Sequence, residues 1–180
     1  MEKTVYLSSS ALEAGLGTIL QSPKDQGSLE YIVRRPRVDE REIVSAATLD
    51  PQEGLMGDTW ISRGNGTQNP DAQLTLMNAR VIALVAGTKD RWALAGDQLF
   101  VDLDLSAANL PAGSRLAVGT AIIEISALPH TGCDKFKARF GQDALVFVNG
   151  PAHRDLRMRG VNARILQPGT VRTGDTIRKI

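Results

Sequence analysis

The sequence has few of the residues that build metal centres and disulfides. It contains one cysteine, Cys133, and two histidines, His130 and His153, among 180 residues. A zinc site with the usual four Cys/His ligands is therefore excluded by count, and so is a disulfide within the chain. A free thiol is typical of a reducing compartment, so we expect a cytoplasmic protein.

Long apolar segments and a strong charge of one sign are also missing. No apolar run approaches the ~20 residues needed to cross a bilayer, and the amino end from Met1 to Thr4 lacks the pattern of a secretion signal. The chain carries 21 Lys and Arg against 20 Asp and Glu, a net charge of +1. This balance argues against nucleic acid and against a membrane surface as partners.

Three common catalytic or nucleotide-binding motifs are absent. The chain has no Gly-x-Ser-x-Gly segment, which argues against a serine hydrolase of that type. It also has neither Gly-x-Gly-x-x-Gly nor the lysine-containing phosphate loop. The usual sequence signals for a dinucleotide or a nucleoside triphosphate are therefore not found.

The charges that are present are unevenly distributed. Residues 39–58 hold six acids and one base, whereas residues 133–164 hold seven bases and three acids. A local excess of bases over 32 residues is compatible with a small basic pocket but not with a long basic groove.

Apolar positions recur mainly with a period of two, in short segments interrupted by Gly and Pro, which indicates a sheet-rich domain. We expect strands at residues 29–34, 42–46, 99–105, 116–118, 121–125, 162–166, 171–173 and 176–180. We expect short helices at residues 78–86, 131–140 and 143–149. The fold class predicted is mostly β with short helices (β or α+β), built on a largely antiparallel β-barrel.

Cys133 is the first candidate for chemistry. Thr131 followed by Asp134 has the form of a capping box, which places Cys133 in the first turn of the helix. Free N–H groups and the positive end of the helix dipole stabilise a thiolate there, and we expect His130, Lys135 and Lys137 to act in the same direction and Asp134 to oppose them. A small buried apolar cysteine is the alternative, and both interpretations stay open.

Two further segments could bind a ligand. The turn from Gly54 to Trp60 contains Gly57 and Asp58, and it is compatible with close approach to a ligand or with a simple turn. Arg157, Arg159 and Arg164 could hold a phosphate, or they could form a solvated edge.

Four motifs occur together and in order: Gly54-Leu-Met-Gly-Asp-Thr-Trp60, Gln73-Leu-Thr-Leu-Met-Asn78, His130-Thr-Gly-Cys-Asp-Lys-Phe136, and Arg159-Gly-Val-Asn-Ala-Arg164 followed by residues 168–175. In this combination the chain resembles the MOSC domain, which is found at the carboxyl end of molybdenum cofactor sulfurases and as small bacterial proteins. The resemblance covers residues 29–180. Residues 1–28 lie outside it and are expected to pack on the barrel.

The resemblance implies a β-barrel that handles molybdenum cofactor (molybdopterin) or sulfur, with Cys133 as a persulfide carrier or as a thiolate ligand to molybdenum. Cofactor contacts would then come from matching positions: Gly57, Asp58, His130, Lys135, Arg159, Asn162 and Arg164. Thr59 departs from the pattern, because many relatives have a basic residue there.

The family also suggests partners. A persulfide carrier would receive sulfur from a cysteine desulfurase, a pyridoxal phosphate enzyme, and we expect no pyridoxal phosphate on this chain. An alternative is a molybdenum-dependent reductase of N-hydroxylated compounds, which would need a separate electron-transfer protein because one cysteine cannot hold an iron–sulfur cluster. A second alternative is a non-enzymatic barrel that binds a small ligand or a partner protein.

Overall fold

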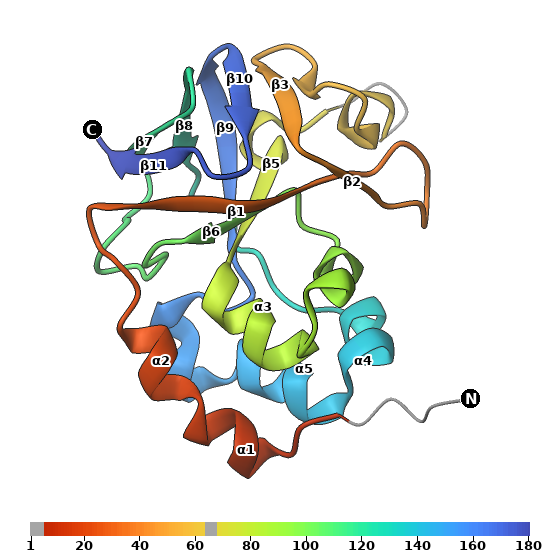
Figure 1. Cartoon of the computed structure of the whole chain (residues 1–180), viewed down its shortest axis with the longest axis vertical. Helices are drawn as coiled ribbons and strands as arrows, with labels where there is room; N and C mark the ends of the chain where they lie inside the picture. Colours follow the sequence, from red (N-terminus) through yellow and green to blue (C-terminus); the bar gives the residue numbers. More distant parts are fainter. Residues whose placement is uncertain (1–5, 64–67) are drawn as a thin grey trace.

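A computed structural model describes residues 6–63 and 68–180, so the expectation for the first four residues lies outside the part described. Its centre is a closed barrel of seven strands, ordered β11-β7-β8-β9-β5-β6-β1, in which β11 pairs back onto β1 (Figure 1). The bounds of the barrel strands are β1 (Gln26–Arg34), β5 (Leu74–Asn78), β6 (Leu99–Asp102), β7 (Arg115–Val118), β8 (Ala121–Ile125), β9 (Val161–Gln167) and β11 (Thr176–Lys179). The predicted fold class and barrel are confirmed.

Neighbouring strands are antiparallel except at one place. β5 and β6 run parallel, which requires a crossover between them. That crossover is α3 (Ala79–Ala86) followed by the 3₁₀ helix η3 (Lys89–Ala95). The sequence marks the start of α3 with Asn78, whose side chain caps the helix by accepting from Arg80 N–H.

Short strands extend the barrel and cover it. β2 (Glu42–Val44) pairs with the end of β1, and a second sheet contains β3 (Ala46–Asp50), β4 (Gly54–Leu55) and β10 (Gly169–Arg172). Leu49, Leu55 and Val171 of the second sheet belong to the same apolar core as the barrel interior. Burial of these side chains attaches the second sheet to the barrel.

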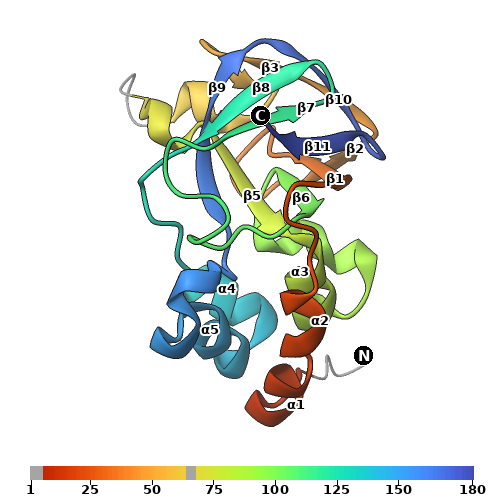
Figure 2. The same ribbon diagram turned by 90° about the vertical axis from the view of Figure 1, so that its left-hand side faces the viewer.

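Helices gather at one end of the barrel (Figure 2). They are α1 (Ser9–Ala14), α2 (Leu16–Leu20), α3, α4 (Asp134–Phe140) and α5 (Gln142–Asn149), with the 3₁₀ helix η4 (Pro151–Leu156). A second apolar core lies among them and contains Phe136, Phe140 and Phe147. Phe136 and Phe140 stack with their ring centres 4.8 Å apart, as their spacing of four predicts.

The amino-terminal helices pack against the other helices. Leu12 of α1 and Ile19 of α2 lie in the second core, and the Ser9 N–H donates to Asp143 of α5. Residues 26–28 already belong to β1. The segment from 6 to 25 therefore rests mainly on the helical layer beneath the barrel.

Two sequence expectations need correction. The strand expected at 99–105 ends at Asp102. Leu103 and Leu105 still point into the barrel core, but Phe100, which the alternation places on the wetter face, is fully buried in the second core. Burial occurs because the helices cover that face of β6. The strand expected at 42–46 is divided at Ser45 between β2 and β3.

Candidate functional site

Cys133 lies directly before α4, whereas the sequence predicted that it would lie inside the first turn of the helix. The helix begins at Asp134, so Cys133 is itself the N-cap residue and Thr131 is not. A serine or threonine cap would accept a hydrogen bond from the first turn; the Cys133 sulfur does not meet the geometry of a capping hydrogen bond, but the N–H groups of Lys135 and Phe136 still act on it. The thiol is exposed rather than packed in the core.

The pKa of the Cys133 thiol is lowered from its ordinary value. The main cause is the backbone N–H of Phe136, with that of Lys135 adding to it, while partial burial acts in the opposite direction. Arg159 and Arg139 supply the favourable charges. The nearby cations His130, Lys135 and Lys137 were expected in this role, but Arg159 and Arg139 perform it. A thiol of this kind is a better nucleophile and metal ligand at neutral pH than an ordinary cysteine.

Cys133 borders a cavity of about 380 Å³, which we call the cysteine cavity. That volume is within the usual range for small-molecule sites, roughly 300–1,000 Å³. Its basic lining residues are Arg35, Arg37, Arg41, Arg63, Lys135, Arg139 and Arg159. Only Arg139, Arg159 and Lys135 come from the basic segment found in the sequence; the others come from the β1–β2 loop and the turn after β4.

Several of these guanidinium groups are close enough to repel one another. Burial first, then the charges of Arg139 and Arg35, lower the pKa of Arg41. Arg63 behaves in the same way, with burial followed by the charge of Arg35. Arginine remains charged even so, and an anion in the cavity would relieve this repulsion.

A buried carboxylate organises the wall of the cysteine cavity. Asp97 has no exposed side-chain surface; its Oδ1 atom lies 2.8 Å from His130 Nε2 and its Oδ2 atom accepts from Arg159. Burial would raise the pKa of Asp97, but the charges of Arg159 and His130 outweigh it and hold the pKa at about 2. Arg159 also lies over the ring of Phe136, 5.0 Å from its centre.

Three other predicted site residues have structural partners instead of an open face. The Asp58 carboxylate is buried and accepts two hydrogen bonds of 2.8 Å from Arg35. Gly57 has φ of +85°, and a β-carbon there would lie 2.7 Å from Arg34, which explains the glycine. The Asn162 amide donates to the carbonyls of Leu128 and Pro129 and so fixes the loop before His130.

The remaining predicted residues are divided between the cavity and the outside. Lys135 lies at the rim, 3.4 Å from Asp39. Arg164 pairs with Asp71 and Glu124 and does not line the cysteine cavity. The three arginines of the 157–164 segment therefore do not converge on one group. His153, the other histidine of the chain, pairs with Glu13.

Sequence reasoning missed Asp97, Arg35, Arg41 and Arg63. Asp97 follows a glycine in an apolar segment, where a carboxylate needs a buried cation, and that pattern could have drawn attention to it. The three arginines had no such signal. They are far from Cys133 in sequence, and only the tertiary structure brings them to the cavity.

A barrel with an exposed, acidified thiol beside a basic cavity defines a class of protein that can hold an anionic, thiol-reactive or metal-bearing ligand. The sequence model of the MOSC domain matches residues 68–178. The chain belongs to the MOSC domain family, and membership associates it in general terms with molybdenum cofactor. No match was found among curated proteins.

Solved structures share the fold. The YuaD protein of Bacillus subtilis is 17% identical, with a TM-score of 0.60 over 84% of this chain and 94% of its own. YiiM of Escherichia coli is 18% identical, with a TM-score of 0.53 over 85% and 69% of the two chains. YiiM of Geobacillus stearothermophilus is 13% identical, with a TM-score of 0.54 over 88% and 74%.

Within residues 6–63 and 68–180, no helix has the length and apolar character needed to cross a membrane. The longest α-helices there have eight residues.

Proposed function

We propose that this protein binds molybdenum cofactor in the cysteine cavity, with the Cys133 thiolate as a ligand to molybdenum. The observation that carries the proposal is the position of a low-pKa, exposed thiol at the border of a cavity lined by seven basic side chains. A soft anionic sulfur suits molybdenum, and the guanidinium groups suit the cofactor's phosphate.

The residues present fit such a group. Among the residues described, the buried Nε atoms of Arg41 and Arg159 have no hydrogen-bond partner, and both side chains line the cysteine cavity. Unsatisfied buried donors are uncommon in folded proteins, and small side-chain movements on binding an anion would satisfy them. The described residues offer the metal no cluster of three His, Cys, Asp or Glu side chains, so its other ligands would come from the cofactor.

Each residue then has a definite task. Cys133 holds the metal end, while Arg41, Arg63 and Arg139 hold negative charge. Asp97 keeps Arg159 and His130 in place, because its two oxygens bind one of them each. When bound, the cofactor supplies a metal that exchanges electrons with a substrate. If the protein is a reductase of N-hydroxylated compounds, those electrons come from a separate electron-transfer protein.

A persulfide carrier is the second candidate, and the exposure of Cys133 favours it. A sulfur donor such as a cysteine desulfurase must reach the thiol directly, and the thiol is accessible at the surface. The same low pKa supports attack by the thiolate on the donor's persulfide sulfur. In this case the basic cavity would serve the acceptor of the sulfur.

Expression in a host that makes molybdenum cofactor tests the proposal. Molybdenum and pterin are measured per chain after purification of wild-type protein, Cys133→Ser and Arg63→Gln. Arg115→Gln is the matched control, because Arg115 is an exposed arginine that pairs with Glu124 outside the cavity. We expect both signals in wild type and in Arg115→Gln, loss of molybdenum in Cys133→Ser, and reduced pterin in Arg63→Gln.

Other outcomes separate the alternatives. Full cofactor loading of Cys133→Ser would refute a molybdenum–thiolate bond. Empty wild-type protein that gains 32 Da at Cys133 after incubation with a cysteine desulfurase and cysteine would establish the persulfide carrier instead. If neither occurs, and Cys133 is alkylated at pH 7 no faster than an ordinary thiol, the non-enzymatic barrel is the remaining interpretation.

A further inference from the structure

A second cavity, of about 550 Å³, lies on the other side of the loop that leads to Cys133. We call it the arginine cavity. The residues on its border are Ala107, Ser126 to Thr131, Val148, Asn149, Arg154, Asp155, Arg157 and Arg159 to Val161. Cys133 is not among them. His130 and Arg159 border both cavities, so they form a common wall.

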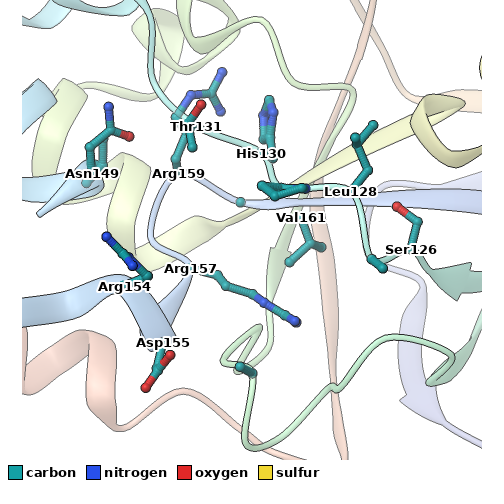
Figure 3. A pocket seen from close by; sticks show the side chains of 15 residues that line it. Ser126, Leu128, His130, Thr131, Asn149, Arg154, Asp155, Arg157, Arg159 and Val161 are labelled. Atoms are coloured by element: carbon teal, nitrogen blue, oxygen red, sulfur yellow. The ribbon is translucent and has the colours of Figure 1, made fainter. Parts of the chain in front are cut away.

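The arginine cavity has both charged and apolar side chains on its border. Figure 3 shows Arg154, Asp155 and Arg157 in and just after η4, with Arg159, His130 and Leu128 across from them. Leu128 is 39% exposed, and Val148 and Val161, which are 5% and 3% exposed, add a small apolar area. A ligand with a charged end and an apolar body would match this arrangement.

The two arginines of this edge lack carboxylate partners. Within the described residues neither Arg154 nor Arg157 forms a salt bridge, and the one side-chain hydrogen bond recorded for them joins Arg157 to the carbonyl of Leu110. Asp155 is adjacent but forms no salt bridge with either. Burial lowers the pKa of Arg157, and the charge of Asp155 only partly opposes it.

The position of Arg157 favours an anion here. Arg157 ends η4 in the left-handed conformation, with φ of +49° and ψ of +47°, and its side chain is half-buried. A half-buried guanidinium without a carboxylate partner is costly unless an anion approaches it.

We propose that the arginine cavity is a second binding site, separate from the cysteine cavity, for a small organic anion with a flat apolar body and a phosphate or carboxylate group. Arg154 and Arg157 bind the anionic group, and Leu128, Val148 and Val161 contact the body. This site does not depend on bound molybdenum cofactor.

The site is also connected to the cysteine. Asn149, on its border, accepts from the Gly132 N–H at 2.8 Å and donates to the Gly132 carbonyl at 3.0 Å. Gly132 precedes Cys133 directly. A ligand that contacts Asn149 and Thr131 therefore rests on the segment that positions the thiol, and an occupied arginine cavity would alter the reactivity of Cys133.

Titration of ¹⁵N-labelled protein tests the proposal with three probes: phenyl phosphate, benzoate and inorganic phosphate. We expect phenyl phosphate or benzoate to shift the amide signals of Thr131, Asn149 and Val161. The tighter of these two probes identifies phosphate or carboxylate as the preferred group. It should bind at least tenfold more tightly than inorganic phosphate, because the ring buries apolar surface of ~100 Å² or more.

Variants assign the binding to the two arginines. Arg154→Gln should weaken binding of the tighter probe about tenfold, the loss of one charge-assisted hydrogen bond. Arg154 is exposed, so this variant should fold even if Arg157→Gln does not. The matched control is Arg115→Gln, which removes an exposed arginine that borders neither cavity. The alkylation rate of Cys133 by iodoacetamide, with and without the probe, measures the connection to the thiol.

Three results would overturn the proposal: unchanged binding in Arg154→Gln, shifts confined to the cysteine cavity, or no advantage of the aromatic probes over inorganic phosphate. Loss of probe binding in protein loaded with molybdenum cofactor would also overturn it, because the cofactor would then fill both cavities. If the protein binds no cofactor, the proposed function fails. The titration of cofactor-free protein still decides whether the arginine cavity binds an organic anion.

Discussion

Replacement of Asp97 by asparagine should be one of the most damaging single changes near the site. The side chain keeps its size but loses its charge, and this leaves Arg159 buried without a counter-ion. Removing one partner of a buried ion pair costs about 3–5 kcal/mol. We therefore expect Asp97→Asn to lower the free energy of unfolding by about that amount at pH 7.

The pH dependence of wild-type stability gives an independent estimate of the stabilisation that the Asp97 charge contributes. Asp97 has a pKa of about 2 in the fold, against an ordinary value of 3.8, a difference equivalent to about 2 kcal/mol. Because the folded-state pKa is the lower one, this stabilisation is present above pH 4 and is lost as the pH falls from about 4 to 2. Asp97→Asn should lose less stability than wild type over that interval.

Urea unfolding followed by tryptophan fluorescence measures both quantities, at pH 7 and at pH 3. Arg159→Met combined with Asp97→Asn is the matched control, since it removes both charges and should be less destabilised than Asp97→Asn alone. The alkylation rate of the Cys133 thiol is a second readout. If Arg159 stays in place in Asp97→Asn, the charge of Arg159 is no longer neutralised, so alkylation of Cys133 should accelerate. A cost below 1 kcal/mol with the native fold retained would refute this reasoning.

Three further predictions concern the surroundings of Cys133. Arg139→Gln should raise the pKa of the thiol and slow its alkylation at pH 7 by about two- to fivefold. The rate of reaction with iodoacetamide, measured against pH, tests this. Arg115→Gln, far from the thiol, should leave the rate unchanged. Gly160→Ala should destabilise the fold by more than ~2 kcal/mol in urea unfolding. The reason is that φ of Gly160 is +117° and the new β-carbon would lie 2.2 Å from the Leu76 carbonyl oxygen. A stable variant would show that β5 and the 157–160 turn can separate. Asn149→Ala removes both hydrogen bonds to Gly132 and should increase amide hydrogen exchange at residues 132–134 at a cost of about 1–3 kcal/mol; unchanged exchange there would mean that other contacts hold the loop.

Much of the barrel was predictable because its information is local. Alternating apolar residues, with Gly and Pro between them, give the hairpin of β7 and β8 and the strands β1, β9 and β11. Asn78 and Gly87 mark the two ends of α3. Phe100 was misjudged because alternation shows which residues share a face of a strand, whereas the helices that cover the outer face are distant in sequence.

The candidate site was only partly predictable for the same reason. The segment from His130 to Phe136 identified Cys133, and the reactivity of its thiol follows largely from the backbone N–H groups of α4, which are local. Capping preferences favoured Thr131 as the helix start, but the described helix begins one residue after Cys133.

The sequence by itself determined the position of the candidate thiol, the excess of basic residues after it and the type of fold, because each depends on neighbours within a few turns or strands. Only the tertiary structure decided which arginines face the thiol. Arg35, Arg41 and Arg63 reach the cysteine cavity, while Arg164 lies elsewhere. Contacts between distant segments hold these side chains, as when Arg35 pairs with Asp58 and donates to the Gly96 carbonyl, and electrostatic fields depend on distance in space rather than on distance along the chain.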